Sequence, residues 1–438
     1  MAAGARVNKM PGTLALGRKD QLWKNYKTLQ TKFGPKMFDF LPETFNIPDD
    51  WDHLVSAMAG SKDPWIAKPT ASSCGDGITV VTEPGQITLG RSVLSVQKYI
   101  SDPFLINGLK FDLRLYVLLT NIDPVKIYLY SDGIVRFATK QYSMKEETID
   151  DKYIHLTNYS VNKRNEDFVF NEAPDELNGH KWSLKMLWKY FETQGLDHCR
   201  VWDQIKDIVV KTIICGHTSI KKAFKENVNS DYNCYKLFGF DVILDASLKP
   251  WLLEVNNFPT LNHKSLDRHV NEAMIAEMFN ILGFHITEPL TNKRKKAIGD
   301  RNAIESWVEF DSQMYARKRN NNDSYKDENN DKSIIFDESK LNSADIRVLI
   351  KSEDELDQTV NFTRLLPCAG GQKYISCFQE QSYSDNLLQH WESKYGMEDN
   401  RGREVLIKLC QEEVHIKDFV CQRKNNKSKC GIKKILIG

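Results

Sequence analysis

The pattern of apolar and polar residues predicts a series of strands in the first two thirds of the chain. Apolar runs with the length expected of strands lie at residues 65–68, 78–81, 93–100, 108–119, 124–138 and 238–256. The fifth run is interrupted by Ser131-Asp132-Gly133, which predicts a hairpin turn at that point. The last run consists of two apolar strands joined by the polar residues 245–249, which predicts a second hairpin.

Apolar residues at helical spacing predict helices around these strands. Near the N-terminus, Leu22, Tyr26 and Leu29 recur about one turn apart and predict a short helix. Further amphipathic segments lie at residues 184–191, 202–213, 270–282, 343–350, 386–395 and 405–410. Strands flanked by helices, followed by a smaller helical C-terminal region, indicate the α/β (α+β) class.

The hairpin at residues 238–256 carries a concentration of hard oxygen atoms. Folding it about its polar turn places Asp241 almost opposite Glu254, and Asn256 shares the face of Glu254. Two carboxylates and an amide oxygen on one side of an apolar hairpin suit Mg²⁺. An exposed edge with solvated acids is the simpler interpretation of an isolated hairpin, so the metal site depends on the residues upstream.

Charged residues also interrupt other apolar strands. Alternation along the fourth run places Lys110, Asp112 and Arg114 on one face, and Arg136 interrupts the next run. Charges on strands this apolar need partners. A mutually paired structural network and a cleft that holds a charged ligand both satisfy that need, and the sequence does not choose between them.

A loop of small residues follows Lys68. It contains Gly75 and Gly77 between two short strands, as a flap over nucleotide phosphates does, because glycine lets backbone N–H groups approach the oxygens. An ordinary hairpin turn is the commoner explanation for two such glycines, and Asp76 is a poor neighbour for phosphate.

Two further segments have the character of ligand-contacting loops. Residues 97–100 end a strand before a turn at Asp102-Pro103, which is consistent with a hinge whose backbone meets a purine edge. Residues 155–160 gather hydrogen-bonding side chains after a polar loop, as a segment that grips a ligand does.

Composition excludes several classes of protein. The formal net charge of +1 argues against a generally basic nucleic-acid-binding protein. No apolar run approaches the roughly 20 residues of a membrane span, and the N-terminal residues lack the apolar core of a signal peptide. Nine cysteines without a Cys-x-x-Cys pair fit reduced thiols. These features predict a soluble, cytoplasmic protein.

The composition changes near residue 290. Basic clusters occur at residues 293–296 and 317–319, and residues 319–332 are nearly all polar, which predicts a disordered linker. Residues 423–429 are basic too, although such runs are usually solvated faces. The expected organisation is a short N-terminal cap at 1–60, a core at 61–290, a linker at 291–335 and a helical extension with a basic tail at 336–438.

The order of the motifs resembles the tubulin–tyrosine-ligase-like family. The resemblance covers about residues 17–283. It rests on Lys68 with the glycine loop, residues 97–100, residues 110–114, Arg136, residues 155–160, Asp241 and residues 254–256. Segments 179–182 and 237–240 are most similar to the type-four branch of the family's polyglutamylases. The resemblance implies an ATP-grasp fold with antiparallel sheets flanked by helices.

The resemblance also implies roles for particular residues. ATP would be bound by Lys68, Gly75, Gln97, Lys98, Tyr99, Ile100, Lys110, Phe111, Asp112, Thr157 and Asn158. Mg²⁺ would be held by Asp241, Glu254 and Asn256, and the incoming glutamate by Arg136, Tyr159, Ser160 and Lys181. Arg114, Arg136 and Glu254 would be catalytic, with Arg114 facing the reacting carboxyl group or the γ-phosphate.

The implied reaction is an ATP-dependent carboxylate–amine ligation. ATP would phosphorylate the γ-carboxylate of a glutamate in an acidic tubulin tail, and the amine of free L-glutamate would attack the acyl phosphate to give an isopeptide branch. The expected partners are tubulin and microtubules, with neither nucleic acid nor membrane. A monomer at the cytoskeleton, and at a cilium or basal body where cells have one, is expected.

One departure from the family pattern affects the flap. Family members carry Arg-Gly where this chain has Cys74-Gly75 followed by Asp76. Loss of a hydrogen bond to a charged group costs about 1.5–3 kcal/mol, so weaker ATP binding is expected unless Lys68 compensates. The region upstream of residue 60 is also short for the family. The alternatives are a catalytically weakened microtubule-binding relative, and a ligase that adds glycine or acts on other acidic proteins.

Overall fold

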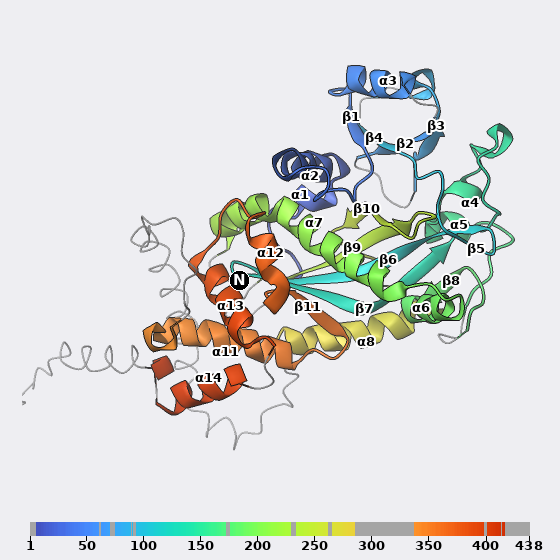
Figure 1. Ribbon diagram of the computed structural model, residues 1–438. Helices are drawn as coiled ribbons and strands as arrows, with labels where there is room; N and C mark the ends of the chain where they lie inside the picture. The colour runs from blue at the N-terminus through green and yellow to red at the C-terminus, as the bar shows by residue number, and fades with distance from the viewer. Residues whose placement is uncertain are drawn as a thin grey trace, which may run out of the picture. The chain divides into compact units, whose positions relative to one another are not determined.

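The computed structural model describes residues 6–60, 63–70, 75–88, 90, 93–171, 176–228, 234–261, 265–284, 337–397, 401–412 and 414–416. The chain divides into two compact units. The first is drawn from residues 1–279, 360–366 and 376–380, and the second from residues 280–359, 367–375 and 381–438. Both sheets belong to the first unit (Figure 1).

The smaller sheet is four-stranded and antiparallel, in the order β1-β4-β2-β3. Its strands are β1 (Thr44–Ile47), β2 (Trp65–Pro69), β3 (Thr79–Val81) and β4 (Leu94–Lys98). Helix α3 (Trp51–Ala59) covers one face, where Leu54 and Met58 pack with Trp65 and Val96 (Figure 1). The strand that carries Lys68 therefore lies beside the strand that carries Gln97.

The larger sheet has seven strands, with the path β10-β9-β6-β7-β11 and with β5 and β8 added to β6 and β7. The bounds are β5 (Leu105–Ile106), β6 (Leu109–Ile122), β7 (Val125–Phe137), β8 (Lys181–Ser183), β9 (Lys236–Leu244), β10 (Pro250–Asn256) and β11 (Phe362–Leu366). Nearly every residue of β6, β7 and β9 is buried, so charges on these strands must find partners inside the protein.

Helices of the first unit surround this sheet. They are α1 (Leu14–Gly17), α2 (Lys19–Phe33), α4 (Lys152–His155), α5 (Tyr159–Asn162), α6 (Leu184–Thr193), α7 (His198–Asn227) and α8 (Ser265–Ile281). The 30-residue α7 begins at the N-cap Asp197, whose side chain accepts from the Arg200 N–H, and it contacts β6, β7, β10 and β11 (Figure 1). The predicted helices in this part of the chain are confirmed.

The hairpin predicted at residues 131–133 is wrong. Strand β7 runs without a break through that stretch, and its register against β6 skips from Leu115↔Gly133 to Val117↔Leu129. A Cβ on Gly133 would lie 2.5 Å from the Arg114 carbonyl oxygen, so the close approach of the backbones requires glycine. The Asp132 carboxylate accepts from the Gly133 N–H at 2.8 Å. The Ser-Asp-Gly stretch therefore marks a β-bulge.

The hairpin predicted at residues 238–256 is confirmed. Strands β9 and β10 are antiparallel, and a bulge between Leu252 and Glu254 brings Glu254 directly opposite Asp241. The turn is closed by Leu248, at a φ of 64°, and by the Asp245 carboxylate, which accepts from the Lys249 N–H at 3.0 Å.

The second unit is helical, with α11 (Ser343–Asp357), α12 (Gln372–Ile375), α13 (Tyr383–Tyr395) and α14 (Arg401–Gln411). Its core is built from Ile346, Leu349, Leu388, Trp391 and Leu406, as the predicted helices required. Within the described ranges, no helix is long and apolar enough to cross a membrane.

The domain boundaries expected from the sequence remain predictions. Two strands connect the expected segments. Strand β1, from the expected cap, joins the smaller sheet, and β11, from the expected helical extension, pairs with β7. The basic clusters at 293–296 and 317–319, the polar stretch at 319–332 and the tail at 423–429 lie outside the described residues.

Candidate functional site

A cleft of about 670 Å³, open to solvent, lies between the two sheets of the first unit. Its walls are formed by Ile66, Lys68, Ile78, Gln97, Lys98, Tyr99, Ile100, Lys110, Asp112, His155, Leu156, Thr157, Asn158, Asp241, Ile243, Leu253 and Glu254. The smaller sheet supplies one wall, the larger sheet the other, and residues 155–158 close one side. Apolar walls with converging charges suit a ligand with a flat apolar part and an anionic part.

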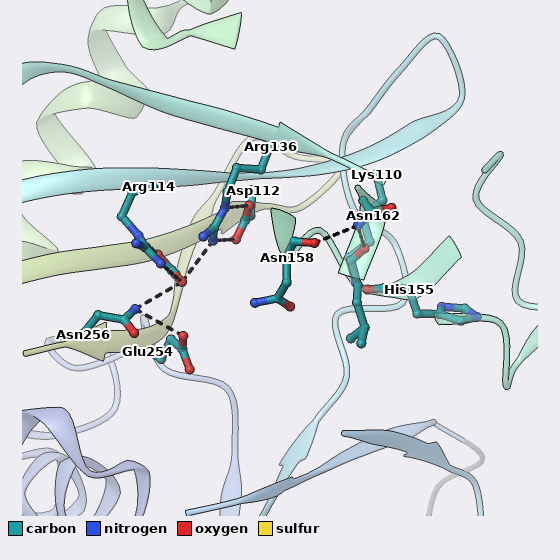
Figure 2. A network of polar contacts seen from close by, with 11 residues as sticks. Lys110, Asp112, Arg114, Arg136, His155, Asn158, Asn162, Glu254 and Asn256 are labelled. Atoms are coloured by element: carbon teal, nitrogen blue, oxygen red, sulfur yellow. Dashed lines mark hydrogen bonds and ion pairs between the residues drawn. The ribbon is translucent and has the colours of Figure 1, made fainter. Parts of the chain in front are cut away.

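Four charged side chains form a continuous network across three neighbouring strands of the larger sheet (Figure 2). Arg136 Nε donates to Asp112 Oδ1 at 2.8 Å, and Arg114 donates to both carboxylate oxygens of Asp241 at 2.5 and 3.0 Å. Each of these pairs joins residues that stand opposite each other in the register. Arg136 also reaches Asp241 at 3.0 Å. The charges on these strands therefore pair with one another and also line the cleft.

The network sets the protonation of its carboxylates. Burial disfavours the charged form of Asp241, but the guanidinium groups of Arg114 and Arg136 outweigh it and hold its pKa well below the usual range. For Asp112, burial is the dominant effect and raises the pKa despite the pairing with Arg136. Asp241 therefore presents a permanent negative charge at the cleft.

The three predicted metal ligands converge (Figure 2). Asn256 Nδ2 lies 3.3 Å from Asp241 Oδ2 and 3.2 Å from Glu254 Oε1, so its amide group stands between the two carboxylates. The oxygen and nitrogen of an amide exchange places when the group turns by half a rotation. Turned in that way, Asn256 would present a third oxygen at the same point. The set fits a small divalent cation that prefers oxygen ligands.

Two buried lysines face the cleft from opposite sheets. Lys68 Nζ donates to Gln97 Oε1 at 2.8 Å, and Gln97 in turn donates to Thr44 at 3.1 Å. Lys110 Nζ donates to the Tyr99 hydroxyl at 2.8 Å. Burial lowers the pKa of Lys68 to about 8 and that of Lys110 to about 7, although nearby carboxylates oppose the change. Among the residues that the structure describes, neither lysine has a carboxylate within ion-pairing distance, so both suit an anionic ligand.

His155, the first residue of the segment predicted to grip a ligand, completes the surroundings of Lys110. Lys110 Nζ donates to the His155 carbonyl at 2.9 Å, and the Tyr99 hydroxyl lies 2.9 Å from His155 Nδ1. His155 Nε2 lies 3.1 Å from the Thr148 carbonyl, so Nε2 carries the proton and Nδ1 accepts from Tyr99. Burial, followed by the charge of Lys110, lowers the pKa of the imidazole. A neutral histidine thus orients the tyrosine that accepts from Lys110.

Most of the residues expected to bind ATP lie in or beside this cleft. The Lys98 ammonium forms an ion pair with Asp63 at 2.7 Å. A Cβ on Gly75 would lie 3.3 Å from Asn158 Oδ1, which places the described end of the glycine loop beside the cleft wall. Phe111 is an exception among the residues expected to bind ATP, because its ring packs against Phe104 and Phe137 in the core. Cys74 lies outside the described residues.

The residues expected to hold glutamate form a second group. Lys181 stands opposite Arg136 in the register of β8 and β7, and its ammonium lies 3.8 Å from the centre of the Tyr159 ring. The same ammonium pairs with Asp267 at 2.7 Å, a partner that was not predicted. Ser160 follows Tyr159 on α5. Lys19 was not assigned to the site either, yet it pairs with Glu254 at 3.2 Å. In both pairs, Lys181–Asp267 and Lys19–Glu254, the partners are more than 80 residues apart in the sequence, so no local pattern indicated them.

Comparison with known sequences identifies a protein family that this chain matches. The sequence model described as "Tubulin-tyrosine ligase family" matches residues 1–296. Tubulin monoglutamylase TTLL4 of Mus musculus is 37% identical over 426 residues, which cover 94% of this chain and 35% of that protein. Tubulin polyglutamylase TTLL5 of Mus musculus is 40% identical over 300 residues, covering 68% of this chain and 22% of that protein.

A shorter relative is matched over most of its length. Tubulin polyglutamylase ttll-4 of Caenorhabditis elegans is 34% identical over 428 residues, which cover 93% of this chain and 67% of that protein. This chain spans about a third of the length of the mouse monoglutamylase that it matches. The similarity continues past the family model at residue 296 into the helical second unit.

Proposed function

The chain belongs to the tubulin–tyrosine ligase family, and we propose that it is an ATP-dependent ligase that adds glutamate to γ-carboxylates in the acidic C-terminal tails of tubulin. The names of its relatives support this activity, since they are called tubulin monoglutamylases and polyglutamylases. The observation that carries the proposal is the cleft between the sheets. There, two buried lysines on opposite walls face a network of two carboxylates and two arginines.

ATP would lie in the cleft with its base between the apolar residues of the two walls, such as Ile66 and Ile243, and beside Tyr99 and Ile100. Lys68 and Lys110 would face the phosphates, whose negative charge complements the two ammonium groups. Tyr99 would keep Lys110 in place by accepting from it. The protein then contributes mainly position and charge, as phosphoryl transfer requires.

A divalent cation fits beside the phosphates. Asp241, Glu254 and Asn256 would hold it, since their side chains already converge within 3.3 Å of one amide group. When bound, Mg²⁺ would neutralise part of the phosphate charge. Arg114 and Arg136 keep Asp241 ionised, and both guanidinium groups add positive charge close to where the γ-phosphoryl group would leave ADP.

The two reacting groups would meet beside this network. The acceptor carboxylate would take the γ-phosphoryl group and release ADP. The amine of free glutamate would then attack the acyl carbon, displace phosphate and lose a proton to it. Arg136 and Lys181, whose backbones are paired, would hold the carboxylates of the incoming amino acid. Asp267 would restrain Lys181 until the amino acid arrives.

The direct test uses purified chain, microtubules, Mg-ATP and either labelled glutamate or labelled glycine. We expect incorporation of glutamate, and we expect E254Q to abolish it by removing one predicted metal ligand. The matched control is E272Q, because Glu272 is an exposed acid paired with Arg268 on α8. Incorporation of glycine in place of glutamate would replace the proposed activity by glycylation.

The alternative is a catalytically weakened relative that still binds microtubules. It rests on the flap, where Cys74 stands in place of the arginine found in the family and Asp76 adds a negative charge two residues later. A C74R variant that raises activity several-fold would show that the flap limits ATP binding. Co-sedimentation with microtubules without incorporation of either amino acid, in both the natural chain and C74R, would favour this alternative over the ligase.

A further inference from the structure

The two carboxylate oxygens of Glu254 are engaged by different partners. Oε1 accepts from Asn256 Nδ2 at 3.2 Å, and that same nitrogen lies 3.3 Å from Asp241. Oε2 lies 3.2 Å from the ammonium of Lys19, a residue of the N-terminal helix α2. One oxygen of Glu254 therefore belongs to the predicted cation site, while the other is held by an element far away in the sequence.

Lys19 lines a recess that adjoins the main cleft. The recess is lined by Lys68, Gln97 and Glu254, which also line the cleft, together with Lys19 and Trp23 from α2. The Lys19 side chain is 16% exposed and that of Glu254 is 25% exposed, so the pair is largely shielded from water. An ion pair in such a place is screened less than one on the surface.

The backbone that carries Lys19 is anchored on two sides. A Cβ added to Gly17 would lie 2.2 Å from Asn257 Nδ2, so the junction of α1 and α2 packs directly against the residue that follows Asn256. On the other side, Asn46 Nδ2 donates to the Asp20 carbonyl at 3.2 Å and ties the start of α2 to β1. The ammonium is thus delivered to Glu254 from a fixed position.

We propose that Lys19 is a positioning residue for the divalent-cation site, which holds Oε2 of Glu254 so that Oε1 stays turned toward Asp241 and Asn256. The inference rests on the proposed function, because it concerns the site where Mg-ATP would bind. Groups that hold a metal-binding carboxylate from behind commonly change metal affinity by about 10–100-fold when removed.

Charge alone would act in the opposite direction. A fixed ammonium near the site repels a divalent cation, so if Lys19 did nothing but contribute charge, its removal would strengthen cation binding. If Lys19 instead orients Glu254, removal of Lys19 must weaken cation binding. The sign of the change therefore separates the two effects.

The test measures cation binding without catalysis. Mn²⁺ serves as the probe, and free Mn²⁺ is followed by electron paramagnetic resonance in the presence of the full chain without nucleotide. We expect K19M to weaken binding by roughly 10–100-fold. K19Q keeps a hydrogen-bond donor without the charge and should recover part of the affinity. K24M is the control, because Lys24 is an exposed neighbour on α2 whose ammonium lies 3.8 Å from Asp49.

Two comparisons decide the result. If wild type binds Mn²⁺, E254Q does not, and K19M and K19Q bind as tightly as wild type or more tightly, the role of Lys19 is overturned while the cation site stands. If wild type and E254Q take up Mn²⁺ equally, the cation site itself is overturned. Thermal unfolding of each variant identifies any loss of folded protein, and K19Q replaces K19M if K19M does not fold.

Discussion

Arg136 Nη2 lies 3.0 Å from Asp241 Oδ2, although the two residues stand on strands β7 and β9, which are separated by β6. The contact runs diagonally across β6. On that strand, Asp112 pairs with Arg136 and Arg114 pairs with Asp241. It converts two ordinary cross-strand pairs into one network. Because the network is buried and faces the cleft, it links the stability of the sheet to the chemistry of the site.

Replacement of Asp241 by asparagine should harm both properties. D241N removes a charge that two buried guanidinium groups share, and breaking a buried pair in this way costs about 3–5 kcal/mol. D39N is the control, because Asp39 is exposed and its surface pair with Lys249 is worth less than about 1 kcal/mol. Urea unfolding measures the stability, and Mn²⁺ binding measures the site. Equal stability of the two variants would contradict the network.

ATP affinity should fall as the pH rises from about 7 to 9. Burial lowers the pKa of Lys110 to about 7 and that of Lys68 to about 8, so both lose their protons within this range in the free protein. Phosphate favours the charged lysines, so ATP binding must take up protons, at a cost of up to about tenfold in affinity per pH unit for each proton. Titration of ATP binding at several pH values measures this slope.

The variant K110R tests which group is responsible. Arginine stays charged throughout the range, so the slope should become shallower. K185R, at an exposed lysine of α6, should leave the slope unchanged. An identical slope in K110R and wild type would mean that Lys110 does not contact the phosphates.

Removal of the Tyr99 hydroxyl should weaken ATP binding without unfolding the protein. In Y99F, Lys110 loses one acceptor and His155 Nδ1 loses its donor. A lost hydrogen bond to a charged group costs about 1.5–3 kcal/mol, so the Kd for ATP should rise roughly 10-fold or more. Y190F, on α6, is the matched control. Calorimetric titration with ATP gives the comparison, and an unchanged Kd in Y99F would remove Tyr99 from the site.

Loss of Glu277 should destabilise the first unit. Its carboxylate accepts from the backbone N–H groups of Val360 and Phe362 at 2.7 Å and of Asn361 at 2.8 Å, and so fixes the start of β11 beside α8. E277A should lower the free energy of unfolding by roughly 2–4 kcal/mol. E272A, which breaks only an exposed pair, should cost less than about 0.5 kcal/mol. Thermal or urea unfolding distinguishes the two, and equal losses would contradict this role.

The local pattern of apolar and polar residues predicted most helices and strands correctly. It failed at residues 131–133, where a sequence typical of a turn forms a β-bulge instead. Helices such as α2, α7 and α13 follow from residues three and four apart, and the β9–β10 hairpin follows from two apolar runs with a polar turn. At 131–133, the Ser-Asp-Gly stretch has the composition of a turn, but β6 and the Asn361 carbonyl, which accepts from the Ser131 N–H, keep the backbone in the sheet. Tertiary pairing overrode the local preference.

Residue spacing indicates which residues carry charge into apolar strands and that Asp241 faces Glu254 across one hairpin. The bulge after Leu252 that sets this register was not predicted. Those features depend on residues close together in the chain, whose spacing sets the face that each side chain occupies. Folding of the whole unit was needed to place β6 between β7 and β9, to set His155 against Tyr99 and to bring Lys19 to Glu254. These contacts join segments separated by tens to hundreds of residues, and strand order and packing fix them, because no local spacing does.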